Sequence, residues 1–222
     1  MSGDILFDET RDARIGIPEA VLCEGKSFSA LSSLFSKFED PAAKPILFTR
    51  LSEEIFARIS PSTRGSYNYD PSSRTAWNRT CPPHSVGSAA VVSAGTSDSA
   101  VVGEASRTLL YLGWKTDLYE DCGVAGLWRI QKYLPKVNQH DVIIVAAGMD
   151  GALPTVLAGL TDKPIFAVPT SVGYGASEGG RTALNAMLTS CAPGISVLNI
   201  DNGYGAACAA SRVLRLLESK RK

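Results

Sequence analysis

A thiol and several carboxylates, hydroxyls and glycines follow short apolar runs in the second half of the chain. These stretches read IIVAAGMDGALP (143–154), PIFAVPTSVGYGASEGG (164–180), NAMLTSCAPG (185–194) and VLNIDNGYGA (197–206). In an open α/β sheet, ligands bind outside the carboxyl ends of the strands, so polar clusters after strands predict one site at that edge. Cys191 and Asp150 lie in these clusters, and enzymes use thiols as nucleophiles and carboxylates as bases. A single cysteine is nevertheless more often a small core residue.

A further polar cluster, GTSDS (95–99), follows the first predicted strand of this half and precedes a predicted helix. Backbone N–H groups at a helix N-terminus, together with hydroxyls, form a seat for phosphate, and the helix dipole adds a favourable potential. The carboxylate of Asp98 disfavours an anion, which predicts that Asp98 contacts a hydroxyl, a ring or a metal ion. Capping of the helix by Asp98 or Ser99 explains the same residues equally well.

Strand and helix signals alternate strictly from residue 88 onward. The predicted strands are apolar without in–out alternation, as in VIIVAA, which indicates burial on both faces and a parallel sheet. Right-handed crossovers favour a doubly wound five-stranded α/β sheet of strand order 2-1-3-4-5, as in flavodoxin-like folds. We expect strands at 89–94, 115–119, 141–146, 164–168 and 195–200, and helices at 100–112, 124–133, 153–160, 179–189 and 205–217.

The first 83 residues predict a small α+β domain. Strand signals at 19–25 and 45–49 alternate with helix signals at 27–38 and 52–59, and Ser27 is the N-cap candidate of the first helix. Residues 67–77 predict an extended segment that Pro71 interrupts. Proline and glycine crowd residues 80–88, which predicts a boundary there between domains 1–83 and 84–222.

The balance of charge disfavours some partners. Lys plus Arg equals Asp plus Glu at 22 each among 222 residues, so no overall field attracts nucleic acid or an anionic membrane. The five cysteines are widely spaced without a CxxC pair, which indicates reduced thiols in a cytoplasmic protein. No apolar run reaches about 18 residues and the acidic start lacks one, so we expect neither a membrane span nor a signal peptide.

Several motifs together resemble the LarB family. They are RIGIPEAVLCEGK (14–26), AGTSD (94–98), GVAGLWR (123–129), AAGMDGALP (146–154), VPTSVGYGAS (168–177) and LTSCAPGISVLNIDNGYGA (188–206). The resemblance covers nearly the whole chain and keeps the motifs in family order. It implies that the second domain is similar to the class of phosphoribosylaminoimidazole carboxylase called PurE, with its doubly wound fold and its homo-octameric assembly.

The chain departs both from PurE and from the LarB pattern. PurE enzymes carry a histidine after the second strand and another after the third, whereas the two histidines here, His84 and His140, lie outside both loops. Carboxylate transfer by an imidazole acid–base group is therefore disfavoured, and a phosphoribosylaminoimidazole carboxylase is the weaker alternative. Asp150 stands where the LarB pattern has Glu, which keeps the charge and shortens its reach by one methylene.

The resemblance implies a synthase of pyridinium-3,5-biscarboxylic acid mononucleotide, which begins biosynthesis of the nickel-pincer nucleotide cofactor. Its substrates would be nicotinic acid adenine dinucleotide, CO2 or bicarbonate, and water, and hydrolysis of the phosphoanhydride would release AMP. A pyridinium ring is too electron-poor to attack CO2, but addition of a thiolate gives a neutral dihydropyridine whose carbon 5 is nucleophilic. Loss of a proton and of the thiolate then restores the aromatic ring, so neither biotin nor ATP is expected.

The resemblance assigns Cys191 as the nucleophile, and Cys122 is the competing thiol. Asp150, in the loop after the third predicted strand of the second domain, is the candidate general base or ligand of a divalent cation. Mg²⁺ takes one or two carboxylates plus phosphate oxygens, so Asp98 is a second candidate ligand. The candidate substrate contacts are Gly95, Thr96, Ser97, Asp98, Asp121, Ser171, Val172, Gly173, Tyr174, Gly175, Ser177 and, in the first domain, Arg74, with Arg14, Lys26 and Arg50 as further basic residues there. Turn formation explains Asp121 and the glycine-rich stretch equally simply.

A different class of function keeps the fold without the catalysis. A nucleotide-binding or scaffolding module would retain the phosphate seat of residues 95–99 and would need no thiol at Cys191. Such a module would leave bound nicotinic acid adenine dinucleotide unmodified. The two hypotheses therefore differ in whether a carboxylate is added and AMP is released.

Overall fold

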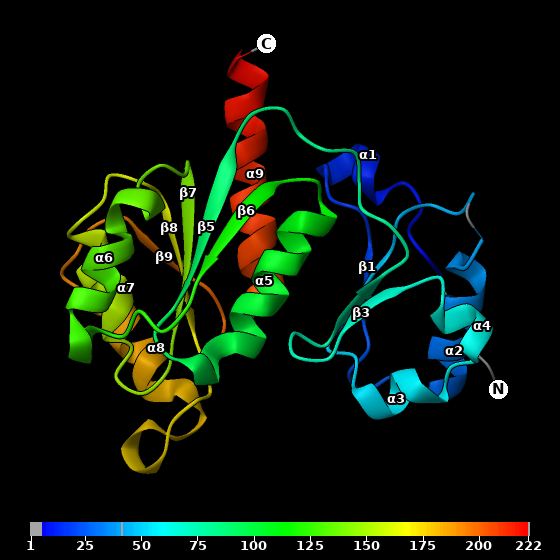
Figure 1. The fold of residues 1–222 in the computed structure, drawn as a ribbon, viewed down its shortest axis with the longest axis horizontal. Helices are drawn as coiled ribbons and strands as arrows, with labels where there is room; N and C mark the ends of the chain where they lie inside the picture. Colours follow the sequence, from blue (N-terminus) through cyan, green and yellow to red (C-terminus); the bar gives the residue numbers. More distant parts are fainter. Residues whose placement is uncertain (1–5, 41, 222) are drawn as a thin grey trace. The chain divides into compact units, whose positions relative to one another are not determined.

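The computed structural model describes residues 6–40 and 42–221. The chain forms two compact units, Met1–Pro83 with Tyr111–Gly113, and His84–Leu110 with Trp114–Lys222. Each unit has its own sheet (Figure 1). Each unit also has its own hydrophobic core.

The larger unit is built on a five-stranded parallel sheet. Its strands are β5 (Ser88–Ser93), β6 (Lys115–Tyr119), β7 (Val142–Ala147), β8 (Ile165–Pro169) and β9 (Ile195–Val197). They pair in the order β6-β5-β7-β8-β9, which confirms the predicted 2-1-3-4-5 order. Every residue of β7 and β8 is buried, as expected for apolar strands covered on both faces.

Helices cover both faces of this sheet. α5 (Ser99–Tyr111) and α9 (Gly203–Arg221) lie on one face, and α6 (Trp128–Val137), α7 (Ala152–Ala158) and α8 (Arg181–Leu188) lie on the other (Figure 1). Short 3₁₀ turns follow three of the strands: η1 (Thr96–Asp98), η2 (Val124–Gly126) and η3 (Gly175–Gly180). The carboxyl ends of the strands therefore carry most of the irregular backbone of this unit.

Some predicted elements have different bounds in the structure. The helix predicted at 124–133 is split, since η2 ends at Gly126 and α6 begins at Trp128. The helix predicted from residue 179 begins at Arg181, because Gly179 and Gly180 adopt left-handed φ angles of 68° and 76°. β9 ends at Val197 rather than at residue 200.

The smaller unit has a four-stranded mixed sheet. β1 (Ala20–Leu22) and β2 (Leu47–Thr49) are parallel, and the hairpin of β3 (Asn68–Asp70) and β4 (Thr75–Trp77) completes the order β1-β2-β4-β3. The hairpin turns at Pro71, where the sequence predicts an interruption of the extended segment. The predicted extended segment is thus two short antiparallel strands.

The described residues of the smaller unit also form four helices: α1 (Arg11–Ile15), α2 (Phe28–Phe38), α3 (Glu53–Arg58) and α4 (Pro61–Arg64). The predicted N-cap of α2 is confirmed, since Ser27 Oγ accepts a hydrogen bond from the backbone N–H of Ala30 at 3.2 Å. The fully buried ring of Phe35 stacks on Phe48 with 4.0 Å between ring centroids. These aromatic contacts give the unit a core of its own.

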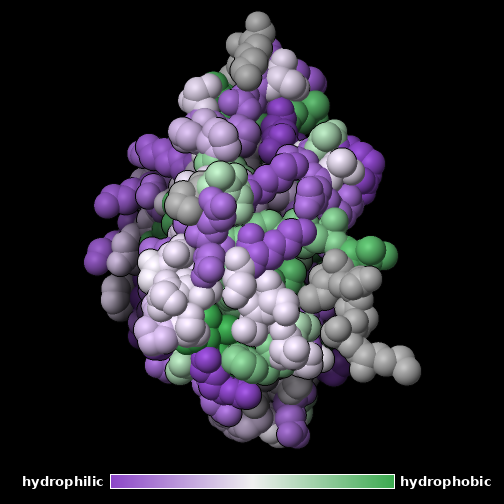
Figure 2. Space-filling view, turned by 90° about the vertical axis from the view of Figure 1, so that its right-hand side faces the viewer, coloured by the Kyte–Doolittle hydropathy of each residue, from purple (hydrophilic) through white to green (hydrophobic). Residues whose placement is uncertain are grey.

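Figure 2 shows one face of the molecule. Hydrophilic residues predominate there, and the apolar residues that the structure describes occur in small separate groups on this face. In the described part of the chain no helix is long and apolar enough to span a membrane.

Candidate active site

A crevice of about 310 Å³ lies at the carboxyl ends of the strands in the larger unit. These ends point to the lower edge of the unit in Figure 1, where α5 begins. The residues that line the crevice are Ala94, Gly95, Ser97 and Asp98 after β5, Gly123, Val124 and Ala125 after β6, Ala147, Gly148, Met149, Asp150, Ala152 and Leu153 at and after β7, and Val172 after β8. Of the predicted site residues, it brings together Gly95, Ser97, Asp98, Asp150 and Val172.

The carboxylate of Asp98 holds the floor of this crevice together. The residue is buried, with 3% of its surface exposed. One oxygen accepts a hydrogen bond from the backbone N–H of Gly95 at 2.9 Å, and the other accepts one from Thr170 Oγ1 at 2.6 Å. The backbone N–H of Gly148 donates to the same carboxylate. Asp98 therefore connects the loops after β5, β7 and β8.

Burial raises the pKa of the Asp98 carboxyl above its ordinary value, and the hydrogen bonds from Thr170 and Gly95 offset part of that rise. Because the folded-state pKa is raised, Asp98 contributes stability below its unfolded-state pKa. That contribution is lost as pH rises through the folded-state pKa. The bond to Gly95 is also a form of capping, so the capping interpretation of Asp98 describes part of its role.

The loop after β7 approaches the loop after β8 closely. A Cβ atom on Gly148 would lie 2.3 Å from the carbonyl oxygen of Val172, so only glycine fits there. The next residue, Met149, donates its backbone N–H to the same carbonyl at 2.9 Å and has a left-handed φ of 53°. A non-glycine residue in this conformation is strained, and such strain is concentrated at functional sites.

Asp150 is the exposed carboxylate of the crevice. Its Oδ1 accepts only a long hydrogen bond of 3.4 Å from the backbone N–H of Ala152, at the start of α7. The side chain is therefore available to a ligand in the crevice, in contrast to the buried and bonded carboxylate of Asp98.

The glycine-rich loop after β8 contributes Val172 to the crevice lining, whereas its other predicted contacts lie outside that lining. Ser171 donates its backbone N–H to Asp201 Oδ1 at 2.8 Å, which ties this loop to the segment before α9. Tyr174 is 78% exposed. The other predicted contacts of this loop outside the crevice lining are Gly173, Gly175 and Ser177, and Thr96 after β5 is also outside the lining.

Cys191 does not lie in the crevice. It is exposed and belongs to the loop between α8 and β9. A loop that precedes a parallel strand lies at the amino ends of the strands, opposite the edge at which the crevice opens. Within one chain, the crevice lining therefore does not bring the predicted nucleophile Cys191 together with Asp150. The residues before Cys191 form a helix, α8, as the sequence predicts.

Two family models match the chain. The model described as LarB/PurE-like N-terminal domain matches residues 3–80, and the model described as AIR carboxylase matches residues 88–222. The chain belongs to the LarB family. It is 35% identical over 218 residues to an uncharacterized protein of Methanocaldococcus jannaschii, a match that covers 95% of the chain and 84% of that protein.

Parts of this LarB-family chain are also similar to a curated mutase and to two solved structures. It is 39% identical over 85 residues to an N5-carboxyaminoimidazole ribonucleotide mutase of Methanocaldococcus jannaschii, covering 36% of the chain and 50% of that protein. It also resembles the crystal structure of Treponema denticola PurE with a TM-score of 0.48 and 19% identity, over 58% of the chain and 80% of that structure. The crystal structure of a PurE2 variant from the same organism gives a TM-score of 0.49 and 18% identity, over 61% of the chain and 82% of that structure.

The competing thiol of this LarB-family chain, Cys122, is fully buried after β6. Burial, with a smaller effect of the Asp121 carboxylate, raises the pKa of the Cys122 thiol to about 11. A thiol with so high a pKa is almost wholly protonated near neutral pH and is a poor nucleophile. Asp121 itself is in an ion pair with Arg129 Nη1 at 2.6 Å, outside the crevice lining.

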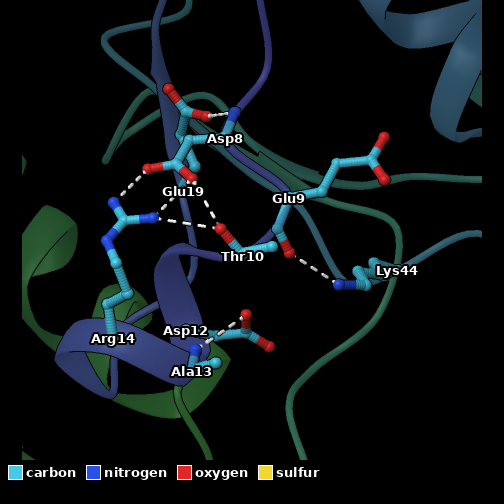
Figure 3. A network of polar contacts seen from close by, with 8 residues as sticks. All are labelled: Asp8, Glu9, Thr10, Asp12, Ala13, Arg14, Glu19 and Lys44. Carbon is cyan, nitrogen blue, oxygen red and sulfur yellow. Dashed lines mark hydrogen bonds and ion pairs between the residues drawn. The ribbon is translucent and has the colours of Figure 1, made fainter.

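The basic candidates of the smaller unit contact groups of that unit. Arg14 donates to both carboxylate oxygens of Asp8, at 3.0 and 2.6 Å (Figure 3). Arg50 is paired with Glu24 at 3.1 Å. Arg74 is exposed, has a left-handed φ of 56° and donates to the carbonyl of Arg50 at 3.3 Å. Each of these side chains thus has a partner close by in its own unit.

Sequence reasoning missed two residues that shape the crevice. Thr170 is a fully buried threonine whose hydroxyl directly follows β8, and its position at a strand end was the available signal. The role of Gly148 depends on the approach of Val172, which only the folded chain shows. Among residues 6–40 and 42–221, no group of three His, Cys, Asp or Glu side chains is placed to hold a metal ion.

Replacing Asp98 by Ala should lower the free energy of unfolding by roughly 3 kcal/mol, because buried donors from three loops lose their acceptor. Asp150→Ala is the matched control, and because that side chain is exposed it should cost less than about 0.5 kcal/mol. Urea unfolding of both variants at pH 7 measures the difference. Equal stability of the two variants would show that Asp98 does not hold the loops together.

The Gly148→Ala substitution should destabilise the protein by about 2–3 kcal/mol, since the added methyl group meets a backbone oxygen that cannot move alone. Gly159→Ala is the control: a Cβ there has its nearest neighbour at 3.5 Å, and its φ is −77°. Thermal unfolding followed by circular dichroism compares the two. A Gly148→Ala protein as stable as the wild type would contradict the close approach of the two loops.

Proposed function

We propose that this LarB-family chain carboxylates nicotinic acid adenine dinucleotide and hydrolyses its phosphoanhydride, which gives pyridinium-3,5-biscarboxylic acid mononucleotide and AMP. The observation that supports this most directly is the crevice, in which the N-terminal end of α5 and the exposed carboxylate of Asp150 face one cavity. A pyridinium dinucleotide offers a flat ring and phosphates, the two kinds of group that such a cavity suits.

In this proposal the segment of Gly95 to Ser97 holds a phosphate. The exposed hydroxyls of Thr96 and Ser97 and the backbone N–H groups before α5 supply donors, and the dipole of the 13-residue helix favours the anion. The sequence alone predicts that the negative charge of Asp98 repels a bound anion. In the structure this repulsion is weaker, because both carboxylate oxygens accept hydrogen bonds from donors of the protein.

The ring reaction needs a thiolate and a base. The thiolate of Cys191 adds to the pyridinium ring, and the electron pair of the resulting neutral dihydropyridine attacks the carbon of CO2 from ring carbon 5. Asp150 takes the proton from that carbon, and the thiolate leaves as the ring regains aromaticity. Attack of water on the phosphoanhydride separately releases AMP.

Because Cys191 is exposed at the amino ends of the strands, we propose that it acts in the crevice of a second copy of the chain. None of the residues that line the crevice is a cysteine. A homo-oligomer, which the family resemblance implies to be an octamer, would bring the α8–β9 loop of one subunit to the crevice of another. The site would then be complete only in the assembly.

A divalent cation such as Mg²⁺ would be held by Asp150 together with phosphate oxygens of the substrate, where it would polarise the phosphoanhydride. The donor set of the crevice fits such an ion only in part. Asp150 offers an exposed carboxylate, whereas both oxygens of Asp98 already accept hydrogen bonds. The protein groups alone do not form a closed metal site.

Incubating the protein with nicotinic acid adenine dinucleotide, bicarbonate and Mg²⁺ should yield two products. They are AMP and a pyridinium mononucleotide that carries one carboxylate more than the mononucleotide half of the substrate. Cys191→Ala should reduce carboxylation by at least about a thousandfold, since the ring cannot be activated without the thiolate. Cys208→Ala, a cysteine within α9, is the matched control and should keep the activity. Mass spectrometry of the products measures both variants.

The products of this incubation also separate the catalytic proposal from the alternative of a nucleotide-binding module. The binding-module alternative is favoured by the absence of a cysteine from the crevice lining. A protein that binds the dinucleotide and returns it unchanged is a binding module. Carboxylation that persists in Cys191→Ala would instead contradict the assigned nucleophile.

Mixed oligomers test whether Cys191 of one copy acts in the crevice of another copy. Cys191→Ala and Asp150→Asn should each be nearly inactive alone. When the two variants are co-expressed with different tags and purified together, the mixture should recover up to about a quarter of wild-type carboxylation. The reason is that some sites then combine an intact Cys191 from one copy with an intact Asp150 from another. Activity of the tandem-purified mixture, relative to each variant alone, is the measurement. A mixture as inactive as its parents would contradict a site shared between copies.

A further inference from the structure

A second cavity adjoins the crevice on the other side of η2. It has a volume of about 200 Å³ and is lined by Glu120 and Asp121 after β6 and by Trp128, Arg129, Lys132 and Tyr133 of α6. Val124 and Ala125 of η2, which lie between these two groups in the chain, line the crevice itself. A single short turn therefore separates the two cavities.

Trp128 is the unusual residue of this cavity. Its side chain is 63% exposed, whereas the two other tryptophans, Trp77 and Trp114, are 9% and 1% exposed. The indole lies beside η2, since a Cβ added to Gly126 would be 3.2 Å from its Nε1 atom. An exposed indole in the wall of a cavity suits the stacking of a flat heterocycle, and a base stacks on an aromatic side chain without regard to sequence.

The charged groups of the cavity suit the ribose and the phosphate of a nucleotide. Arg129 is paired with Asp121 at 2.6 Å, so these two charges offset one another. Lys132 forms no ion pair with a described residue, and its ammonium lies 5.4 Å from the ring centroid of Tyr133. Glu120 Oε1 accepts a hydrogen bond from Ser99 at 2.7 Å. Carboxylates accept hydrogen bonds from ribose hydroxyls, and an ammonium pairs with phosphate.

We infer that this second cavity binds the nucleoside monophosphate half of the dinucleotide, the half that leaves as AMP. The inference rests on the proposed function, in which the pyridinium ring occupies the crevice. The base stacks on Trp128, the ribose hydroxyls donate to Glu120, and the phosphate pairs with Lys132. The phosphoanhydride then lies across η2, between the two cavities and next to the edge that carries Asp150.

AMP alone should therefore bind to the free protein and quench its tryptophan fluorescence, because Trp128 is the only exposed indole among the described residues. In calorimetric titrations, Trp128→Ala should weaken AMP binding about tenfold, and Trp128→Phe, which keeps a ring, should weaken it less. Lys132→Ala should weaken AMP about three- to tenfold and leave adenosine unchanged. Lys136→Ala, which removes the same charge from the exposed surface of the same helix, is the matched control.

Each outcome bears on the inference. The inference would be overturned if AMP did not bind at millimolar concentration, or if the wild type and both Trp128 variants bound AMP with equal affinity. It would also be overturned if Lys136→Ala weakened AMP binding as much as Lys132→Ala does. The titrations need neither carboxylation nor Cys191, and repeating them in Cys191→Ala protein separates the two claims. AMP binding without carboxylation contradicts the proposed function alone, and carboxylation without an effect of Trp128 on AMP contradicts this inference alone.

Discussion

The buried carboxylate of Asp98 is the interaction on which the functional edge of the sheet depends. It accepts hydrogen bonds from donors in the loops after β5 and β7 and at the end of β8, so loops that are distant in sequence share one acceptor. Asp201 extends the arrangement by accepting the backbone N–H of Ser171. Burial makes the charged form costly, but the same burial makes any unpaired donor costly as well, which fixes the loops relative to one another.

With the loops fixed, the crevice acquires its shape from close backbone contacts. Gly148 lets the loop after β7 meet Val172, and the left-handed Met149 turns the chain so that Asp150 stays exposed. Hydrogen-bond donors for phosphate before α5 and the exposed carboxylate of Asp150 after β7 consequently face one space. The missing group is the thiol, and its position at the opposite edge makes assembly of several chains part of the proposed chemistry rather than an addition to it.

Much of the fold could be predicted because it depends on local patterns. Apolar strands such as β7 and β8 and hydroxyl caps such as Ser27 are signals that neighbouring residues carry by themselves. The position of Cys191 could also have been predicted: the residues before it were expected to form a helix, and a loop after such a helix lies at the amino ends of the strands. The bond between Asp98 and Thr170 could not, because 72 residues separate the partners and only packing brings them together.

The central claim is that the sulfur of Cys191 becomes covalently bonded to the pyridinium ring. The protein is quenched with acid during turnover of nicotinic acid adenine dinucleotide and is then digested. Mass spectrometry of the resulting peptides measures the bond directly. The account predicts a nucleotide adduct on the peptide that contains Cys191, and its absence from the peptide that contains Cys122. Turnover with every cysteine unmodified at all times sampled, or an adduct on another residue, would contradict it.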